Sequence, residues 1–168
     1  MKCSRILVVA PAWIGDLVIS ISFLNALRKI NPNSKIDLLI NENLSDIARS
    51  IPYISNVIVS KTKHGKLSLF YRIKLGMNLR KQNYTHCYIL SNSLKSSIVP
   101  LVAGIQNRIS YLGEFRYGFI NKIKQDFHRK DGMANRYLNL IDKRYIEDFK
   151  PTINHVTELK HISNKFKL

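Results

Sequence analysis

The fold is decided by residues 5–30, RILVVAPAWIGDLVISISFLNALRKI. Residues 6–10 form a short apolar run that is typical of a fully buried parallel strand, and Pro11 ends it because proline donates no backbone hydrogen bond. Apolar residues then recur at three- and four-residue steps over 16–30, which predicts a helix packed on a sheet. Such sheets bind ligands outside the carboxyl ends of their strands, and Asp16, where we expect the helix to begin, lies there.

The rest of the chain alternates predicted strands and helices in the same way. The strands are predicted at 35–40, 57–60, 84–90 and 105–111, and the helices at 43–50, 67–81, 94–102 and 135–146. Pro100 should kink or shorten the helix that contains it. Five strands separated by helices and short turns predict an α/β fold with a doubly wound parallel sheet.

Composition limits the class of protein and its partners. The chain has 168 residues, of which 45% are hydrophobic, enough for one domain with a core. Its 27 Lys and Arg against 11 Asp and Glu give a net charge of +16. This charge favours nucleic acid, a phospholipid surface or a phosphorylated substrate as partner.

The location and the cysteines are predicted from the same composition. No apolar stretch reaches the roughly 18 to 20 residues of a membrane span, and the basic start lacks a cleavage site of small residues. We therefore expect a cytoplasmic protein that at most rests on a membrane surface. Cys3 and Cys87 lie in or beside apolar runs with no metal-ligand spacing, which predicts core positions and no metal site.

Asp16 has two open interpretations. The loop before it contains a single glycine, Gly15, and therefore matches neither the GxGxxG fingerprint nor a P-loop. From spacing alone, an N-cap for the predicted helix is favoured over a catalytic carboxylate. Glu42 follows the second predicted strand as a ribose-binding acid of an NAD site would, but the glycines of such a site are missing.

The turn after the fourth predicted strand contains Asn92, Ser93, Lys95 and Ser96. Their backbone N–H groups, hydroxyls and ammonium are suited to bind one phosphate or carboxylate at a helix start. An ordinary Asn/Ser cap beside a solvated lysine is the alternative interpretation.

The loop after the fifth predicted strand is a third candidate. Arg116 is suited to clamp an anion, Tyr117 to stack on a sugar, and Arg108 lies just upstream. An aromatic loop anchored in the core is the alternative. His64 and Arg72 are predicted near the same rim, although a lone histidine on a loop is more often an ordinary surface residue.

Several of these segments resemble the lipopolysaccharide heptosyltransferases of glycosyltransferase family 9. The similar pieces are PAWIGDLVIS at 11–20, His64-Gly65, SNSLKSSIVPLVAGI at 91–105, GEFRYGFIN at 113–121 and MANRY at 133–137. The resemblance implies a GT-B architecture, in which residues 1–148 are a Rossmann-like, N-terminal, acceptor-binding domain. Residues 149–168 are then a polar tail or the start of an inter-domain linker, and the C-terminal donor domain is absent.

The same resemblance implies a reaction. These enzymes transfer heptose from ADP-heptose to the inner core on lipid A, with inversion, and Asp16 matches the general base. The implied substrate-binding residues are Trp13, Gly15, His64, Asn92, Ser93, Lys95, Ser96, Arg108, Arg116 and Tyr117. We expect no metal or cofactor, a donor that is bound mainly by the other domain, and a lipid A acceptor at an anionic inner-membrane surface, where the protein is peripheral.

Departures from the family pattern leave alternatives open. Ser91 replaces a usual Pro, Ser110 a usual Gly and Lys122 a usual Asp. A donor domain on a separate chain, a truncation and a decaying gene all remain compatible with the sequence. The competing function is a non-catalytic basic α/β module for nucleic acid or a membrane surface, but no nucleic-acid motif is visible, so we expect no nucleic-acid partner. An NAD-dependent oxidoreductase is a distant third hypothesis.

Overall fold

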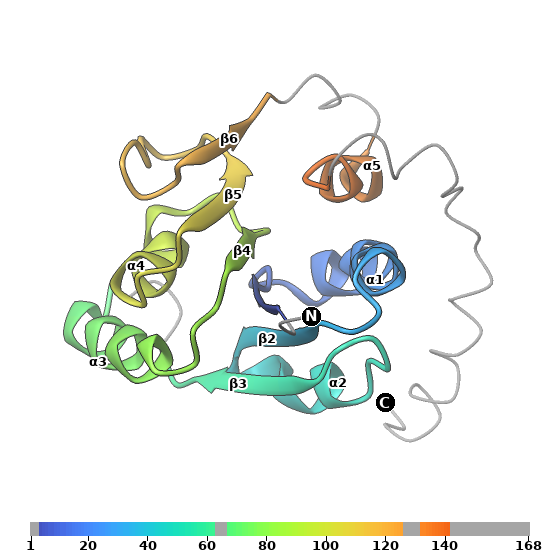
Figure 1. Ribbon diagram of the computed structural model, residues 1–168, viewed down its shortest axis with the longest axis horizontal. Coiled ribbons are helices and arrows are strands. Elements are labelled where there is room, and N and C mark those ends of the chain that lie inside the picture. Colours follow the sequence, from blue (N-terminus) through green and yellow to red (C-terminus); the bar gives the residue numbers. More distant parts are fainter. Residues whose placement is uncertain (1–3, 63–66, 126–131, 142–168) are drawn as a thin grey trace.

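The computed structural model describes residues 4–62, 67–125 and 132–141. A six-stranded sheet in the order β3-β2-β1-β4-β5-β6 forms the middle layer, and all of its neighbouring pairs are parallel (Figure 1). The strands are β1 (Arg5–Val9), β2 (Lys35–Asn41), β3 (Asn56–Ser60), β4 (His86–Ile89), β5 (Asn107–Tyr111) and β6 (Lys122–Lys124). This is the order of a doubly wound sheet, and it confirms the predicted α/β class.

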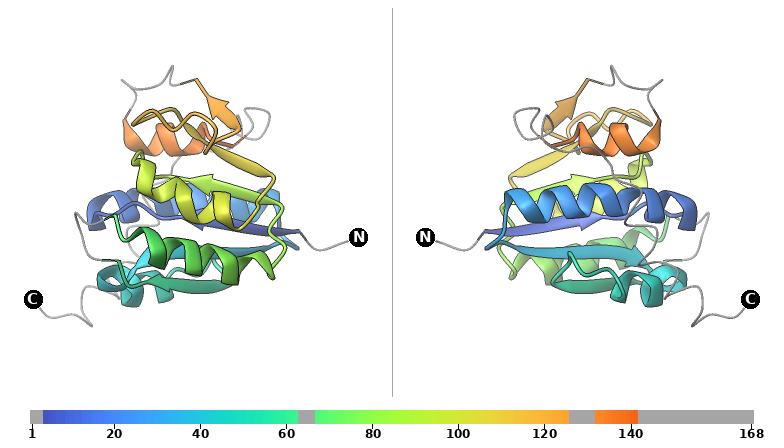
Figure 2. Two further views of the ribbon diagram at one scale, coloured as in Figure 1. Left: turned by 90° about the vertical axis from the view of Figure 1, so that its left-hand side faces the viewer. Right: turned by 90° about the vertical axis from the view of Figure 1, so that its right-hand side faces the viewer.

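Helices cover both faces of the sheet. They are α1 (Ile14–Ile30), α2 (Ser45–Arg49), α3 (Leu69–Arg80), α4 (Leu94–Val102) and α5 (Met133–Leu138), with a short 3-10 turn, η1 (Glu42–Leu44), before α2. Helices α1, α2 and α5 lie on one face, and α3 and α4 lie on the other (Figures 1 and 2). The predicted helix at 135–146 both begins and ends earlier, as α5, because residues 139–141 are not helical. Residues 142–146 lie outside the described part.

Strand β1 is buried on both sides, as its continuous apolar run predicts. Ile6 and Val8 belong to the core beneath α1, α2 and α5, whereas Leu7 and Val9 belong to the core beneath α3 and α4. Because successive side chains of a strand point to opposite faces, one short segment contributes to both cores. Cys87 is buried and free in the second core, as predicted, whereas Cys3 lies outside the described residues.

The structure differs from the sequence prediction at three elements. Strand β6 was not predicted, because its three residues include two lysines and give no apolar signal. Helix α4 has the predicted bounds, but Pro100 does not end it early, because the proline lies in the last turns and removes a single hydrogen bond. In α3, helical spacing predicts that Met77 lies in the apolar face with the other apolar residues. Met77 is exposed instead, since the helix packs on α4 through its buried Gly76.

Candidate active site

A cavity of about 470 Å³ opens at the carboxyl edge of the sheet. It lies between the ends of β1 and β4, where the strand order reverses and where open α/β sheets bind ligands. Its volume falls in the range of about 300 to 1,000 Å³ that small-molecule sites occupy. Of the predicted site residues, the cavity is lined by Trp13, Asp16, Asn92, Ser93, Lys95 and Ser96.

Asp16 lies in the first turn of α1 without capping it. The helix begins at Ile14 with Trp13 as its N-cap residue, and no side chain makes the cap hydrogen bond. The favoured interpretation of Asp16 as an N-cap is therefore wrong. Its carboxylate is half-buried and makes no hydrogen bond or ion pair within the described part of the chain, although the helix N-terminus favours its negative charge.

Tyr137 is near enough to Asp16 to interact electrostatically with it, and it was missed by the sequence analysis. It belongs to α5, is 2% exposed and lines the same cavity. Burial raises the pKa of its phenol, the negative charge of Asp16 raises it further, and Arg136 lowers it. The phenol is therefore protonated at neutral pH, and in the described structure its hydroxyl has no hydrogen-bond partner. The apolar pattern of this segment concealed the residue, because a tyrosine there is typical of a core position.

Two cations form the basic part of the cavity. Arg72 of α3 donates from Nε to the backbone oxygen of Leu67 (2.8 Å) and from Nη1 to that of Lys95 (3.1 Å). Burial lowers the pKa of Arg72, with Tyr71 acting in the opposite direction, but a guanidinium stays charged at neutral pH. The Lys95 ammonium makes no ion pair with any described residue. The cavity therefore combines the carboxylate of Asp16 with two cations.

Glu114 also lines the cavity and was not predicted as a site residue. Its Oε2 accepts a hydrogen bond of 2.7 Å from the backbone N–H of Leu94, the first residue of α4. Glu114 and Phe115 have φ values of +43° and +50°, a left-handed conformation that is costly for residues other than glycine. The anion site predicted at this helix N-terminus is thus already filled by a side chain of the protein.

Arg116 was predicted to clamp an anion, and the structure corrects this. The side chain is fully buried and does not line the cavity. Its guanidinium donates to the backbone oxygens of Ser91 (2.8 Å) and Tyr111 (2.6 Å), among other acceptors. Burial lowers its pKa to about 10, Glu114 raises it and Arg136 lowers it. Arg116 therefore joins the loop after β4 to the loop after β5 and has no face free for a ligand.

Ser110, which replaces the usual glycine of the family pattern, belongs to the buried hydrogen-bond network around Arg116. Its hydroxyl donates to the backbone oxygen of Ile89 (2.6 Å) and accepts from Arg116 Nη2 (3.2 Å). A glycine at this position would supply neither bond. Of the other departures, Ser91 accepts from Arg116 through its backbone, and Lys122 is exposed on β6.

Three other predicted residues do not line the cavity. Arg108 lies near the amino end of β5, where its Nε donates to the backbone oxygen of Phe119 (2.7 Å). Tyr117 is exposed outside the cavity, and Gly15 is exposed next to Asp16 without lining it. His64 lies outside the described residues. The predicted roles of Arg108 and Tyr117 in binding are not supported by these positions.

Residues 4–62, 67–125 and 132–141 contain neither a metal-binding cluster nor a membrane-spanning helix. No three His, Cys, Asp or Glu side chains gather as a metal site would require. No described helix has the length and apolar character needed to cross a bilayer.

Comparison with known proteins identifies the family. The family model of glycosyltransferase family 9 (heptosyltransferase) matches residues 72–167, more than half of the chain. The chain belongs to glycosyltransferase family 9. This membership confirms the resemblance that the motifs carried and does not favour the non-catalytic basic module.

Family 9 relatives are similar in sequence and in structure. Lipopolysaccharide heptosyltransferase 2 of Escherichia coli K12 is 35% identical over 137 residues, which are 81% of this chain and 39% of that protein. Lipooligosaccharide heptosyltransferase 2 of Haemophilus influenzae is 31% identical over 93% of this chain and 44% of its own length. The solved structure of E. coli ADP-heptose lps heptosyltransferase II matches with a TM-score of 0.75 and 29% identity, over 98% of this chain and 51% of that one.

The fold is shared more widely in family 9. A family 9 glycosyl transferase from Veillonella parvula matches with a TM-score of 0.73 at 18% identity, over all of this chain and 51% of that one. The chain thus spans about two fifths of the curated relatives and half of the solved structures. The predicted boundary between residues 148 and 149 lies outside the described residues.

Proposed function

We propose that this chain is the acceptor-side domain of an inverting heptosyltransferase of the GT-B type. The complete enzyme transfers heptose from ADP-heptose to the inner core of lipopolysaccharide at the cytoplasmic face of the inner membrane. One observation carries the proposal: in a family 9 chain, Asp16 has no partner among the described residues and lines a cavity at the switch point of the sheet, together with Lys95. The names of the relatives support the choice of donor and acceptor.

Asp16 is the general base of the proposed reaction. It accepts the proton of the acceptor hydroxyl while that oxygen forms a bond to the anomeric carbon of heptose. ADP leaves from the opposite face of the sugar with the electron pair of the broken bond, so the configuration at the anomeric carbon inverts. Tyr137 is a positioning residue, because its protonated hydroxyl is available to donate to Asp16 or to the acceptor oxygen.

Lys95 and Arg72 hold the anionic groups of the acceptor in this proposal. Both line the cavity, and the hydrogen bond from Arg72 to the backbone oxygen of Lys95 fixes their relative positions. An inner-core acceptor on lipid A has negative charge, which the side chains of Lys95 and Arg72 attract. We assign the ADP-sugar mainly to a C-terminal donor domain, on the same polypeptide or on another, and no cofactor beyond this donor substrate.

A reconstituted transfer assay tests the proposal. The chain is combined with a donor-domain polypeptide of a family 9 relative, ADP-heptose and a heptosylated inner-core acceptor. We expect Asp16→Asn to lower the rate of transfer by about 10²- to 10⁴-fold, the usual contribution of a positioned base. Asp46→Asn is the matched control, because Asp46 is exposed on α2 and does not line the cavity. Absence of transfer with the parent chain, or equal rates for Asp16→Asn and the parent, would contradict the assignment.

A further inference from the structure

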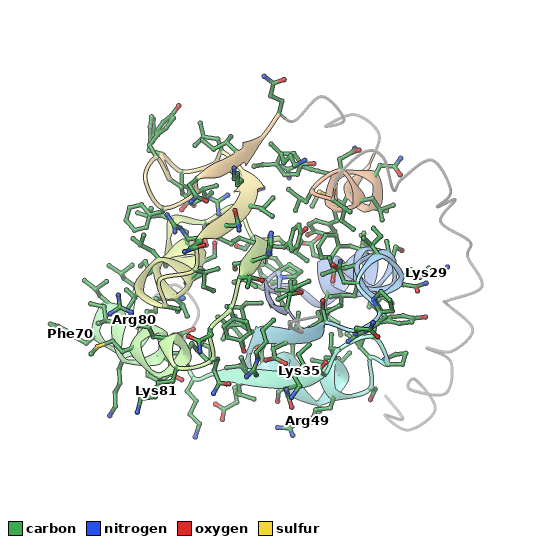
Figure 3. All side chains as sticks on the ribbon, in the orientation of Figure 1. Lys29, Lys35, Arg49, Phe70, Arg80 and Lys81 are labelled. Carbon is green, nitrogen blue, oxygen red and sulfur yellow. The ribbon has the colours of Figure 1, made fainter. Side chains whose placement is uncertain are left out.

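Helix α3 presents a line of four exposed residues to solvent. Phe70, Lys74, Met77 and Lys81 follow one another at steps of four, three and four residues, Lys81 being the C-cap residue. With about 100° between successive helical residues, all four fall within an arc of about 60°. We call these four residues the α3 stripe. Figure 3 shows Phe70 and Lys81 pointing outward from this side of the molecule.

The apolar members of the α3 stripe are unusually exposed. Phe70 is 88% exposed and Met77 is 60% exposed, although both belong to a helix that packs on the domain. The opposite face of the helix makes the packing contact: Gly76 is buried so closely on α4 that a Cβ there would lie 2.7 Å from Cβ of Val102. Because this contact orients the helix, the α3 stripe cannot turn into the core.

The segment of the chain that contains the α3 stripe is basic. The sequence contains no acidic residue between Asp46 and Glu114, and α3 itself adds Arg72 and Arg80 to the two lysines. Arg80 is exposed beside the α3 stripe (Figure 3). A surface of this kind attracts a polyanion, and its apolar side chains require a partner that also has an apolar layer.

We propose that the α3 stripe docks this chain on an anionic lipid bilayer. Phe70 and Met77 enter the boundary between headgroups and acyl chains, while the ammonium groups of Lys74 and Lys81 stay with the lipid phosphates. A bilayer has a layer of phosphates next to an apolar layer of acyl chains, whereas nucleic acid has phosphates without an apolar layer. Arg72 is on the same helix and lines the cavity, so docking through α3 brings the cavity close to the lipid surface.

Vesicle co-sedimentation of the full 168-residue chain tests this inference without any transfer reaction. The chain is mixed with vesicles of phosphatidylglycerol and phosphatidylcholine, and with vesicles of phosphatidylcholine alone. We expect binding to the anionic vesicles and little binding to the neutral ones. The double variant Lys74→Glu/Lys81→Glu should lower the partition coefficient at least about 25-fold, because each basic residue near the surface contributes roughly fivefold. Phe70→Ser should lower it about fivefold, through the loss of the aromatic anchor.

Matched controls separate the α3 stripe from the overall charge of the chain. Lys29→Glu/Lys35→Glu makes the same change in charge at exposed lysines away from α3 (Figure 3). Phe115→Ser removes a phenylalanine that is 90% exposed on a different segment. Both controls should bind like the parent chain, and circular dichroism should confirm that every variant is folded.

Three results would overturn the inference. The first is an equal loss of vesicle binding in the α3 variants and in the controls. The second is absence of binding of the parent chain to anionic vesicles. The third is that the α3 double variant loses binding to single-stranded RNA while its vesicle binding is unchanged. Because the readout is vesicle binding, it can fail while the transferase proposal holds, and transfer can fail while docking holds.

Discussion

The amino and carboxyl edges of the sheet differ in how their acidic side chains are satisfied. Near the amino edge, Asp37 of β2 is 1% exposed and accepts hydrogen bonds from Arg5 (2.9 Å), Tyr84 (2.6 Å) and Asn56 (2.8 Å). Near the carboxyl edge, Asp16 makes no such bond with any described residue and lines a cavity. A carboxylate with three donors holds strands together, whereas one without donors is available to a ligand.

The side chains of the cluster at the amino edge also contact one another. The Arg5 guanidinium forms an ion pair with Asp37 and also lies 5.3 Å from the ring centroid of Tyr84. Burial raises the pKa of Tyr84, and its hydrogen bond to Asp37 raises it further, so that its hydroxyl stays a donor. The comparison thus predicts that substitutions at the amino edge change stability, and that those around the cavity change activity.

The largest expected effect is at Arg116, where the comparison breaks down. This side chain belongs to the carboxyl edge but is buried and fully bonded, so we expect Arg116→Met to lower the free energy of unfolding by about 3–5 kcal/mol. Urea denaturation measures the change. Arg49→Met, at an exposed arginine of α2, is the control and should leave the midpoint unchanged. A small effect at Arg116 would mean that the loops after β4 and β5 do not depend on it.

Exchange of a carboxylate for an amide at each edge sharpens the comparison. Asp37→Asn removes the charge that pairs with Arg5, and we expect a loss of about 2–3 kcal/mol in the free energy of unfolding. Asp16→Asn should lower that free energy by less than about 1 kcal/mol, because only the interaction of the charge with the helix N-terminus is lost. Equal destabilisation of the two variants in urea denaturation would erase the distinction between the two edges.

A smaller effect is expected at Tyr137. Tyr137→Phe removes a buried hydroxyl beside Asp16 and should lower the transfer rate about tenfold, the value of one hydrogen bond to a charged group. The free energy of unfolding should be unchanged, since the hydroxyl has no hydrogen-bond partner in the described structure. Rate and urea midpoint are measured on the same preparation. A drop in stability with an unchanged rate would make Tyr137 a core residue only.

The smallest effect is a pH dependence at the amino edge. Burial lowers the pKa of His86 below its ordinary value of 6.5, so the unfolded chain binds the proton more readily than the folded one. Stability should therefore fall as the pH drops through 6.5 toward the lower folded pKa, and it should be fully present above 6.5. His86→Gln should flatten this part of the stability profile between neutral and mildly acidic pH. An unchanged slope would show that other groups cause it.

The sequence predicted the parallel sheet well because buried strands of this kind are continuous apolar runs. It failed at β6, where pairing with β5 rather than composition makes the strand. It also misplaced Met77, because an apolar residue at helical spacing does not show whether the facing surface belongs to the same domain.

Part of the site was predicted from the order of strands and loops along the chain, and part was not. Position along the chain was enough to place Asp16 and Lys95 at the carboxyl edge, because the loops after parallel strands meet there. Position gave no indication that Arg116 points inward while Glu114, two residues earlier, points to the cavity. That difference depends on the left-handed backbone conformation of Glu114 and Phe115, which their residue types do not predict.

The hydrogen bond between Glu114 and Leu94 has a consequence for selectivity. An anion that is to bind the first N–H of α4 must compete with a carboxylate that is held there by the chain itself. Its apparent association constant is the intrinsic one multiplied by the fraction of molecules in which Glu114 has withdrawn. Stray inorganic anions are thereby rejected, whereas a ligand with further contacts along the cavity can still displace the carboxylate.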